Sequence, residues 1–282
     1  MRIGSFARPR IMGIINVTHD SFFTSSRVAD GERAREMAVK MVGHGADILD
    51  LGGESSRPGS DYVPADEELR RLMPALKAIR EALPEIPLSV DTRKAVVAEK
   101  ALDAGASMVN DISGLRDDPD MPALVAERGV QVCLMHMRGT PRTMQQEPHY
   151  DDLPGELRRE LESLAGRALE AGVKPGQIIL DPGIGFGKTF GHNWSILGEL
   201  ESLSELGYPL MVGLSRKSFL SEAGLDPESG RGEPLAPEER LSATLAAQLW
   251  CTLQGVSILR VHDVKPAVET VRVLERILTA KR

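Results

Sequence analysis

The sequence predicts a (β/α)8 TIM barrel, an α/β fold of eight parallel strands surrounded by helices, with residues 1–282 forming one domain. The first observation is a recurrence in which a helix-like segment ends at a glycine and a short apolar run follows. Glycine suits the position just past a helix because it adopts the left-handed conformation without a Cβ clash. The second observation is that eight apolar runs in about 250 residues match the size of such a barrel. The recurring glycines are Gly45, Gly105, Gly129, Gly172, Gly207 and Gly255.

The eight apolar runs are the predicted strands. They are nearly continuously apolar rather than alternating, which is typical of parallel strands buried on both faces. Between them the apolar positions recur with the period of a helix, as at Leu69, Leu72 and Leu76. An open doubly wound sheet is the main alternative, but the chain has no dinucleotide-binding fingerprint and the count of eight favours closure. The runs cover residues 11–16, 46–51, 87–91, 107–110, 130–136, 177–181, 209–213 and 256–262.

Composition excludes several classes of function. The net charge of −7 argues against binding to a nucleic-acid backbone, which requires a basic surface. No apolar stretch approaches the roughly 20 residues that cross a bilayer, and the first residues lack the apolar core of a signal peptide. We therefore expect a cytoplasmic protein without nucleic-acid or membrane partners. Cys133 and Cys251 lie in apolar runs without metal-ligand spacing, and we interpret them as buried hydrophobic side chains.

Polar residues follow the predicted strands at the point where each ends. A barrel places its active site at these ends. Any single polar end is equally well explained as a cap for the next helix, but eight together predict one polar pocket. His136 stays divided between ligand contact and support of the pocket. In chain order the ends carry Asn16, residues 52–57, Asp91, Asn110 with Asp111, His136, Asp181, residues 215–218, and Arg260 with His262.

The polar ends divide by charge. Asp91 and Asp181 are acceptors suited to a guanidine-like edge, and Asn110 offers both a donor and an acceptor. The second group is basic, or becomes so on protonation, and suits an anion. The pocket is therefore predicted to hold a flat polar heterocycle at one end and a phosphate at the other. The basic group comprises Arg57, Lys217, Arg260 and His262.

Residues 181–189 form a glycine-rich segment that resembles two phosphate-binding motifs without matching either. Pro182 stands where a Walker A loop requires its first glycine, and Lys188 and Phe190 stand where a dinucleotide fingerprint requires its last. We interpret the segment as a loop whose backbone approaches a flat ligand closely, with the ring of Phe186 offering a face.

Taken together, these segments resemble dihydropteroate synthase, the folate-pathway family that joins a dihydropterin pyrophosphate to p-aminobenzoate and releases pyrophosphate. The resemblance runs from Met12 to Val264 and implies a TIM barrel, a magnesium ion, a homodimer and a sulfonamide target. It is carried in chain order by MGIINVTHDSF, DLGGESSRPG, SVDT, VNDISG, CLMHMRGTP, DPGIGFGKT, GLSRKSF and RVHDV, which lie at the eight predicted strands.

The resemblance implies a role for each polar end. The implied pterin-binding residues are Asp91, Asn110, Asp181 and Lys217, with Met137, Gly185 and Phe186 shaping the slot. The implied pyrophosphate-binding residues are Asn16, Ser56, Arg260 and His262, with Asn16 as the magnesium ligand. The implied border of the p-aminobenzoate site is Arg57, Pro58, Ser215 and Ser218. Catalysis would rest on Asp91, Asp181, Lys217, Arg260 and His262.

The family mechanism is dissociative, so pyrophosphate leaves before the arylamine attacks. Basic side chains would stabilise the departing anion while carboxylates favour positive charge on the pterin. No covalent nucleophile is required, and the sequence offers no Ser-His-Asp or Cys-His arrangement. The other functions considered are a pterin-dependent methyltransferase, which would need no pyrophosphate clamp, a catalytically silent pterin-binding paralogue, and a phosphate-binding barrel isomerase, for which no general-base pair is evident.

The sequence departs from the family pattern at three places. His19 replaces the usual proline, residues 23–26 replace the usual Ser-Asp-Gly-Gly, and Ser56 replaces a threonine while keeping its hydroxyl. The first two lie in the first loop, which is thought to close over the site. They predict altered loop closure in an enzyme that remains active.

Overall fold

The computed structural model describes residues 7–17 and 27–280, and the atypical first-loop positions His19 and 23–26 therefore lie outside the described residues. Eight parallel strands form one sheet, which confirms the predicted number and all eight predicted positions to within a few residues. The strands are β1 (Arg10–Asn16), β2 (Ile48–Gly52), β3 (Leu88–Asp91), β4 (Met108–Asp111), β5 (Gln131–Met135), β6 (Ile178–Asp181), β7 (Met211–Gly213) and β8 (Ile258–Val261).

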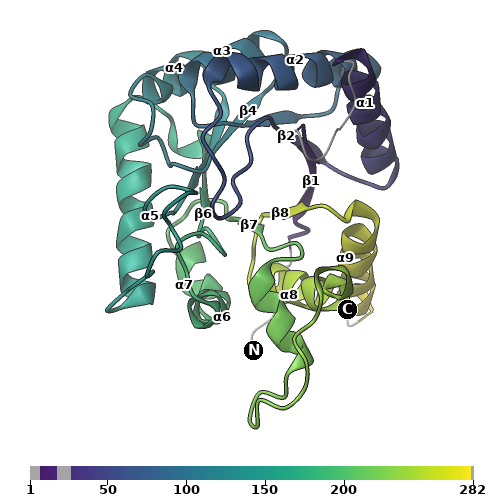
Figure 1. The fold of residues 1–282 in the computed structure, drawn as a ribbon, viewed down its shortest axis with the longest axis vertical. Coiled ribbons are helices and arrows are strands. Elements are labelled where there is room, and N and C mark those ends of the chain that lie inside the picture. Colours follow the sequence, from purple (N-terminus) through teal and green to yellow (C-terminus); the bar gives the residue numbers. More distant parts are fainter. Residues whose placement is uncertain (1–6, 18–26, 281–282) are drawn as a thin grey trace.

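Helices connect successive strands and surround them, as Figure 1 shows. They are α1 (Arg27–Gly43), α2 (Ala65–Ala82), α3 (Ala95–Asp103), α4 (Met121–Arg128), α5 (Leu153–Glu170), α6 (Phe190–Gly198), α7 (Leu200–Ser204), α8 (Leu241–Leu253) and α9 (Val264–Thr279). Short 3-10 turns add η1 (Pro175–Gln177), η2 (Ser218–Gly224) and η3 (Pro237–Glu239). Among the described residues, no helix combines the length and the apolar character that crossing a membrane requires.

The strands follow one another around the barrel in the order β6-β5-β4-β3-β2-β1-β8-β7. The remaining gap, between β6 and β7, is bridged by Leu180 and Leu210 as a single parallel pair. The backbone N–H of Leu180 donates to the carbonyl of Pro209 at 2.9 Å. The sheet is thus a nearly closed barrel rather than an open doubly wound sheet.

The main core lies between the strands and the helices. The helix α2 illustrates why the sequence folds in this way, since Leu72, Leu76 and Ile79 recur at helical spacing and are fully buried. Its acidic first turn suits the positive end of the helix dipole. Cys133 and Cys251 are free and buried, as predicted.

A second, smaller core fills the interior of the barrel. On β2, β4, β6 and β8 this core contains Ile48, Met108, Ile179 and Ile258. Side chains alternate between the faces of a strand, so the residue two places further along each strand also faces inward. These residues are Asp50, Asn110, Asp181 and Arg260. A polar layer therefore sits directly on the apolar one, toward the carboxyl ends of the strands. The apolar layer consists of Met12, Ile48, Met108, Cys133, Ile179, Met211 and Ile258.

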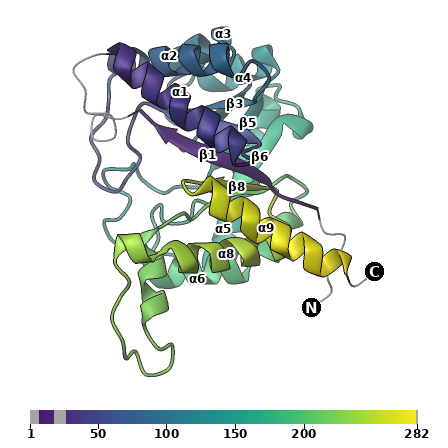
Figure 2. The same cartoon turned by 90° about the vertical axis from the view of Figure 1, so that its right-hand side faces the viewer.

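Two long connections follow β5 and β7. Between β5 and α5, residues 136–152 form irregular structure and turns, and Asp152 caps α5 by accepting a hydrogen bond from the N–H of Gly155. In the other loop, residues 221–224 belong to η2, because the 3-10 turn that follows β7 extends to Gly224. Beyond it the segment before α8 projects away from the barrel in both views (Figures 1 and 2).

Candidate active site

The centre of the polar layer is an ionic group at the strand ends. Arg260 donates from Nε to Asp50 Oδ2 at 2.6 Å and from Nη2 to Asp91 Oδ2 at 2.7 Å. Asn110 donates from Nδ2 to the same Asp50 oxygen at 3.1 Å. The structure thus brings the predicted Asp91, Asn110 and Arg260 together, and it adds Asp50 as their common partner.

Asp50 is the central residue that the sequence analysis missed. It is fully buried, and its Oδ1 has no hydrogen-bond partner among the described residues. A signal was present in the sequence, because Asp50 lies within an otherwise apolar run at the inward-facing position two residues before the strand end. A carboxylate at such a position needs a buried cation, and Arg260 supplies it.

The charges of this group depend on burial and on each other. Burial raises the pKa of Asp91, and the Arg260 guanidinium opposes the shift. Burial also raises the pKa of Asp181, opposed by the backbone N–H of Gly183 and by the charge of Lys217. Burial alone would lower the pKa of Arg260, but Asp50 and Asp91 outweigh it, so its pKa is raised and the guanidinium stays charged.

The glycine-rich loop after β6 brings its backbone close to the side chains of Asp181 and Lys217. Asp181 Oδ1 accepts a hydrogen bond from the N–H of Gly183 at 2.7 Å. Gly185 has a φ of 78°, and a Cβ there would lie 3.0 Å from Cδ of Lys217. The Lys217 ammonium lies 4.4 Å from the ring centre of Phe186 and donates to the carbonyl of Ile184. Burial lowers the pKa of Lys217 to about 8, with Asp181 opposing the shift.

His136 supports this loop through its contacts with Lys188 and Glu160. Lys188, which is 2% exposed, donates from Nζ to His136 Nδ1 at 3.0 Å and to the carbonyl of Phe186 at 2.9 Å. The His136 Nε2 is 2.8 Å from Glu160 Oε2. Burial lowers the pKa of His136 to about 4 and that of Lys188 to about 7. A neutral imidazole therefore accepts from Lys188 and donates to Glu160. In the sequence, Lys188 is informative only because it stands where a dinucleotide fingerprint requires a glycine, so its link to His136 was not predicted.

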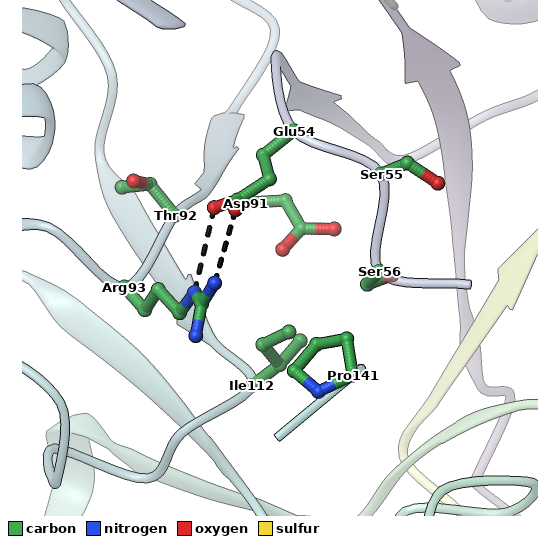
Figure 3. A pocket seen from close by; sticks show the side chains of 8 residues that line it. All are labelled: Glu54, Ser55, Ser56, Asp91, Thr92, Arg93, Ile112 and Pro141. Atoms are coloured by element: carbon green, nitrogen blue, oxygen red, sulfur yellow. Dashed lines mark hydrogen bonds and ion pairs between the residues drawn. The ribbon is translucent and has the colours of Figure 1, made fainter. Parts of the chain in front are cut away.

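A small cavity opens beside Asp91, between the loops that follow β2, β3, β4 and β5. Figure 3 shows the guanidinium of Arg93 turned toward the carboxylate of Glu54 on one side of this cavity, with Ser56 in the opposite wall. Ser56 and Asp91, both predicted, thus share one cavity. Its lining residues are Glu54, Ser55, Ser56, Asp91, Thr92, Arg93, Ile112 and Pro141.

The remaining predicted residues lie around the rim of the barrel. Ser215 is buried, and its Oγ accepts a hydrogen bond from the backbone N–H of His262 at 3.3 Å. His262 follows β8 and is exposed, so it does not share the buried setting of Arg260. Met137 is 2% exposed and belongs to an apolar cluster against which Phe186 packs. The side chains of Arg57, Pro58 and Ser218 are exposed.

The oxygen atoms at the strand ends can bind magnesium only together with further ligands from a substrate or water. The described residues contain no cluster of three His, Cys, Asp or Glu side chains that could hold a metal by themselves. Magnesium is usually bound through one or two protein oxygens together with substrate phosphates and water. Asn16, half-buried at the carboxyl end of β1, offers an oxygen of that kind, so the residues present fit a substrate-borne magnesium ion.

Fold and site together define an enzyme of the barrel class with a polar pocket at the carboxyl ends of its strands. The sequence profile of the pterin-binding enzymes matches residues 12–262. Dihydropteroate synthase of Escherichia coli strain K12 is 42% identical over 275 residues, which are 98% of this chain and 94% of that protein. The chain belongs to the dihydropteroate synthase family of pterin-binding enzymes.

Solved structures of the family agree with this fold. Dihydropteroate synthase of Xanthomonas albilineans with 4-aminobenzoic acid has a TM-score of 0.85 and 41% identity, over 96% of this chain and 93% of that one. The enzyme of Yersinia pestis, in a complex with a sulfonamide drug, has a TM-score of 0.87 and 38% identity, over 96% and 95% of the two chains. Both likenesses extend over nearly the whole barrel.

Proposed function

We propose that this chain is a transferase of folate biosynthesis that condenses 6-hydroxymethyl-7,8-dihydropterin pyrophosphate with p-aminobenzoate, giving 7,8-dihydropteroate and pyrophosphate. The observation that carries the proposal is the polar layer of Asp91, Asn110, Asp181 and Arg260 in a chain of this family. The first three are buried, and the side chain of Arg260 is 18% exposed. Its acidic and amide groups suit a pterin, while its basic group suits a pyrophosphate.

The pterin is proposed to bind in the buried part of the pocket. Asp91, Asn110, Asp181 and Lys217 would contact its ring. The low exposure of the three strand residues supports this, because a buried site excludes competing water. The slot would be shaped by Met137, Gly185 and Phe186. Support comes from the packing of Phe186 against the Met137 cluster and from the close approach of Gly185 to Lys217.

The pyrophosphate is proposed to lie between the ends of β1 and β8. Arg260 has five N–H donors, of which one points to Asp50 and one to Asp91. We propose that others meet the pyrophosphate together with the side chains of Asn16, Ser56 and His262. Magnesium, held by Asn16 and the pyrophosphate, would neutralise part of the charge on the leaving group.

The p-aminobenzoate is proposed to enter from the rim. Arg57 and Pro58 on the loop after β2, with Ser215 and Ser218 after β7, would border it. The exposure of Arg57, Pro58 and Ser218 supports a site open to solvent before the substrate arrives.

The reaction is proposed to proceed by departure before attack. The bond from the pterin methylene carbon to oxygen breaks, and its electron pair leaves with pyrophosphate. The carboxylates of Asp91 and Asp181 stabilise the resulting pterin cation, whereas Arg260 stabilises the anion. The amine of p-aminobenzoate then forms the new carbon–nitrogen bond and loses a proton. Catalysis is thus assigned to Asp91, Asp181, Lys217, Arg260 and His262.

The test is pyrophosphate release from the purified protein with the pterin substrate and magnesium, with and without p-aminobenzoate. Release that accompanies formation of dihydropteroate supports the proposal. Pterin binding without release would identify a silent paralogue instead. As site variants, Lys217→Ala and Asp181→Ala are expected to lose activity while their circular dichroism stays that of the folded protein. Unfolding of both would contradict the assigned roles.

We further propose that residues 1–282 form one domain, which acts in the cytoplasm as a homodimer. Exposed aromatic side chains support a subunit interface on α6 and α8. Trp194 and Trp250 are 39% and 41% exposed although both indole N–H groups already have partners within the chain. Light scattering is expected to give the mass of two chains, and the mass of one chain would contradict the proposal.

A further inference from the structure

Glu54 ties together the two ends of the loop between β2 and α2, residues 53–64, and joins both to the start of α3. Its Oε1 accepts the backbone N–H of Val63 at 3.0 Å, near the far end of the loop. The same oxygen accepts from Arg93 Nη2 at 3.0 Å, and Oε2 accepts from Lys94 Nζ at 2.6 Å. The Glu54 side chain is only 10% exposed, so these bonds are shielded from solvent.

Lys94 binds two carboxylates, one on the loop and one on helix α2. Besides Glu54, its Nζ contacts Glu68 Oε2 at 2.6 Å, and Glu68 is fully buried on α2. The bonds from Arg93 and Lys94 outweigh burial and keep the pKa of Glu54 below its ordinary value, whereas burial raises the pKa of Glu68. Both acids therefore bind the same ammonium, but Glu54 belongs to the loop and Glu68 to the helix.

Tyr62, on the same loop, lies against both basic side chains that bind Glu54. The ring centre of Tyr62 lies 4.5 Å from Lys94 Nζ and 5.2 Å from the Arg93 guanidinium carbon. Arg93 also binds Asp117 at 2.6 Å, which fixes it to the turn after β4. The middle of the loop, which carries Arg57 and Pro58, is exposed.

We infer that Glu54 is a positioning residue for the arylamine substrate, because it holds the loop that carries Ser56, Arg57 and Pro58 in a fixed place beside the cavity. The inference rests on the proposed function. Glu54 acts by closing the base of the loop, and the loop in turn sets the position of the arylamine border. We call the bonds of Glu54 to Val63, Arg93 and Lys94 the Glu54 clamp. The proposed pterin-binding residues lie on the strands and on other loops, so loss of this clamp should leave the pterin site in place.

The experiment compares Glu54→Gln with Glu68→Gln. Each variant removes one carboxylate from Lys94 and leaves it the other, so both change the buried charge in the same way. For Glu54→Gln we expect KM for p-aminobenzoate to rise about tenfold or more, since displacement of a positioning group by about 1 Å has effects of this size. We expect KM for the pterin pyrophosphate to rise by no more than about threefold, because Ser56 is the one proposed contact of that substrate which lies on this loop. For Glu68→Gln both KM values should match those of the unaltered protein.

An unchanged KM for p-aminobenzoate in Glu54→Gln, with the unaltered protein active, overturns the inference. An equal rise in both variants also overturns it, because the effect would then belong to the charge of Lys94. If Glu54→Gln fails to fold, Arg93→Gln replaces it, with a smaller rise in the same KM expected and no rise overturning the inference.

Inactivity of the unaltered protein would be a failure of the proposed function and not of the clamp. The clamp is then judged by chymotrypsin cleavage after Tyr62, which needs no substrate. Faster cleavage in Glu54→Gln than in Glu68→Gln supports the clamp, and equal rates overturn it.

Discussion

Asp50 is the residue whose replacement tests the polar layer most directly. Asp50→Asn keeps the shape of the side chain but removes the charge that faces Arg260 Nε at 2.6 Å. The same oxygen also accepts from Asn110, so one substitution changes the setting of two proposed substrate-binding residues. We expect a loss of both stability and catalytic efficiency.

The size of the loss follows from the contacts. Removing one partner of a buried ion pair costs about 3–5 kcal/mol when the other charge is left alone. Here Arg260 keeps Asp91 at 2.7 Å, and the new amide oxygen still accepts one hydrogen bond. We therefore expect a loss of about 2–3 kcal/mol in the free energy of unfolding, or roughly 4–12 °C in Tm. Misplacement of the guanidinium should lower kcat/KM about a hundredfold.

Asp47→Asn is the matched control. Asp47 precedes the same strand at its opposite end and accepts the backbone N–H of Ile11 at 2.8 Å. We expect thermal unfolding of this control to shift slightly and kcat/KM for the pterin pyrophosphate to stay unchanged, because that end of a barrel serves stability. Full activity and an unchanged Tm in Asp50→Asn would contradict the role assigned to Asp50, as would an equal loss of activity in both variants.

Lys217, Glu160 and Gly183 provide three further tests of the groups around the site. The charge of Lys217 is lost as the pH rises through its pKa of about 8, so kcat/KM should fall above that pH, and Lys217→Arg should move the decline upward. The bonds from His136 and Arg138 outweigh burial and lower the pKa of Glu160 from 4.5 to about 2, so its carboxylate stabilises the fold above pH 4.5 and this contribution is lost as the pH falls toward 2. Melting curves of Glu160→Gln should lack that part of the acid dependence. A Cβ at Gly183, where φ is 67°, would lie 1.9 Å from the His136 carbonyl oxygen, so Gly183→Ala should lose about 3 kcal/mol or more in urea unfolding. Gly166→Ala, on α5 with open space around it, should gain about 0.5–1 kcal/mol.

Each of these predictions has an outcome that contradicts it. An alkaline decline that stays in place in Lys217→Arg would assign it to another group. If the melting curves of Glu160→Gln and of the unaltered protein respond to acid in the same way, Glu160 does not contribute to the acid dependence of stability. Similar unfolding curves for the two glycine variants would show that the loop yields to the added methyl group.

Local patterns were sufficient for the architecture. Apolar runs and helix-ending glycines depend on residues close together in the chain, so they located eight strands without tertiary information. The position of the active site at the strand ends of a barrel also explains why Asp91, Asn110 and Asp181 were found, since each lies at or next to the end of a buried run. Strand ends were less certain, as shown by the run 130–136, of which Gln131–Met135 is the strand.

The barrel, the polar strand ends and the family are thus readable from the amino-acid sequence. The partners of those strand ends required the folded chain, in which Arg260 binds Asp50 across 210 positions and Lys188 binds His136 across 52. The Glu54 clamp likewise joins residues 39 and 40 positions apart. These partners could not be predicted because periodicity indicates only the face on which a side chain lies. A salt bridge also depends on side-chain rotamers, on the stagger of the strands and on the course of the loops. Burial then gives these long-range pairs their weight, because a charge removed from water must find its partner inside the fold.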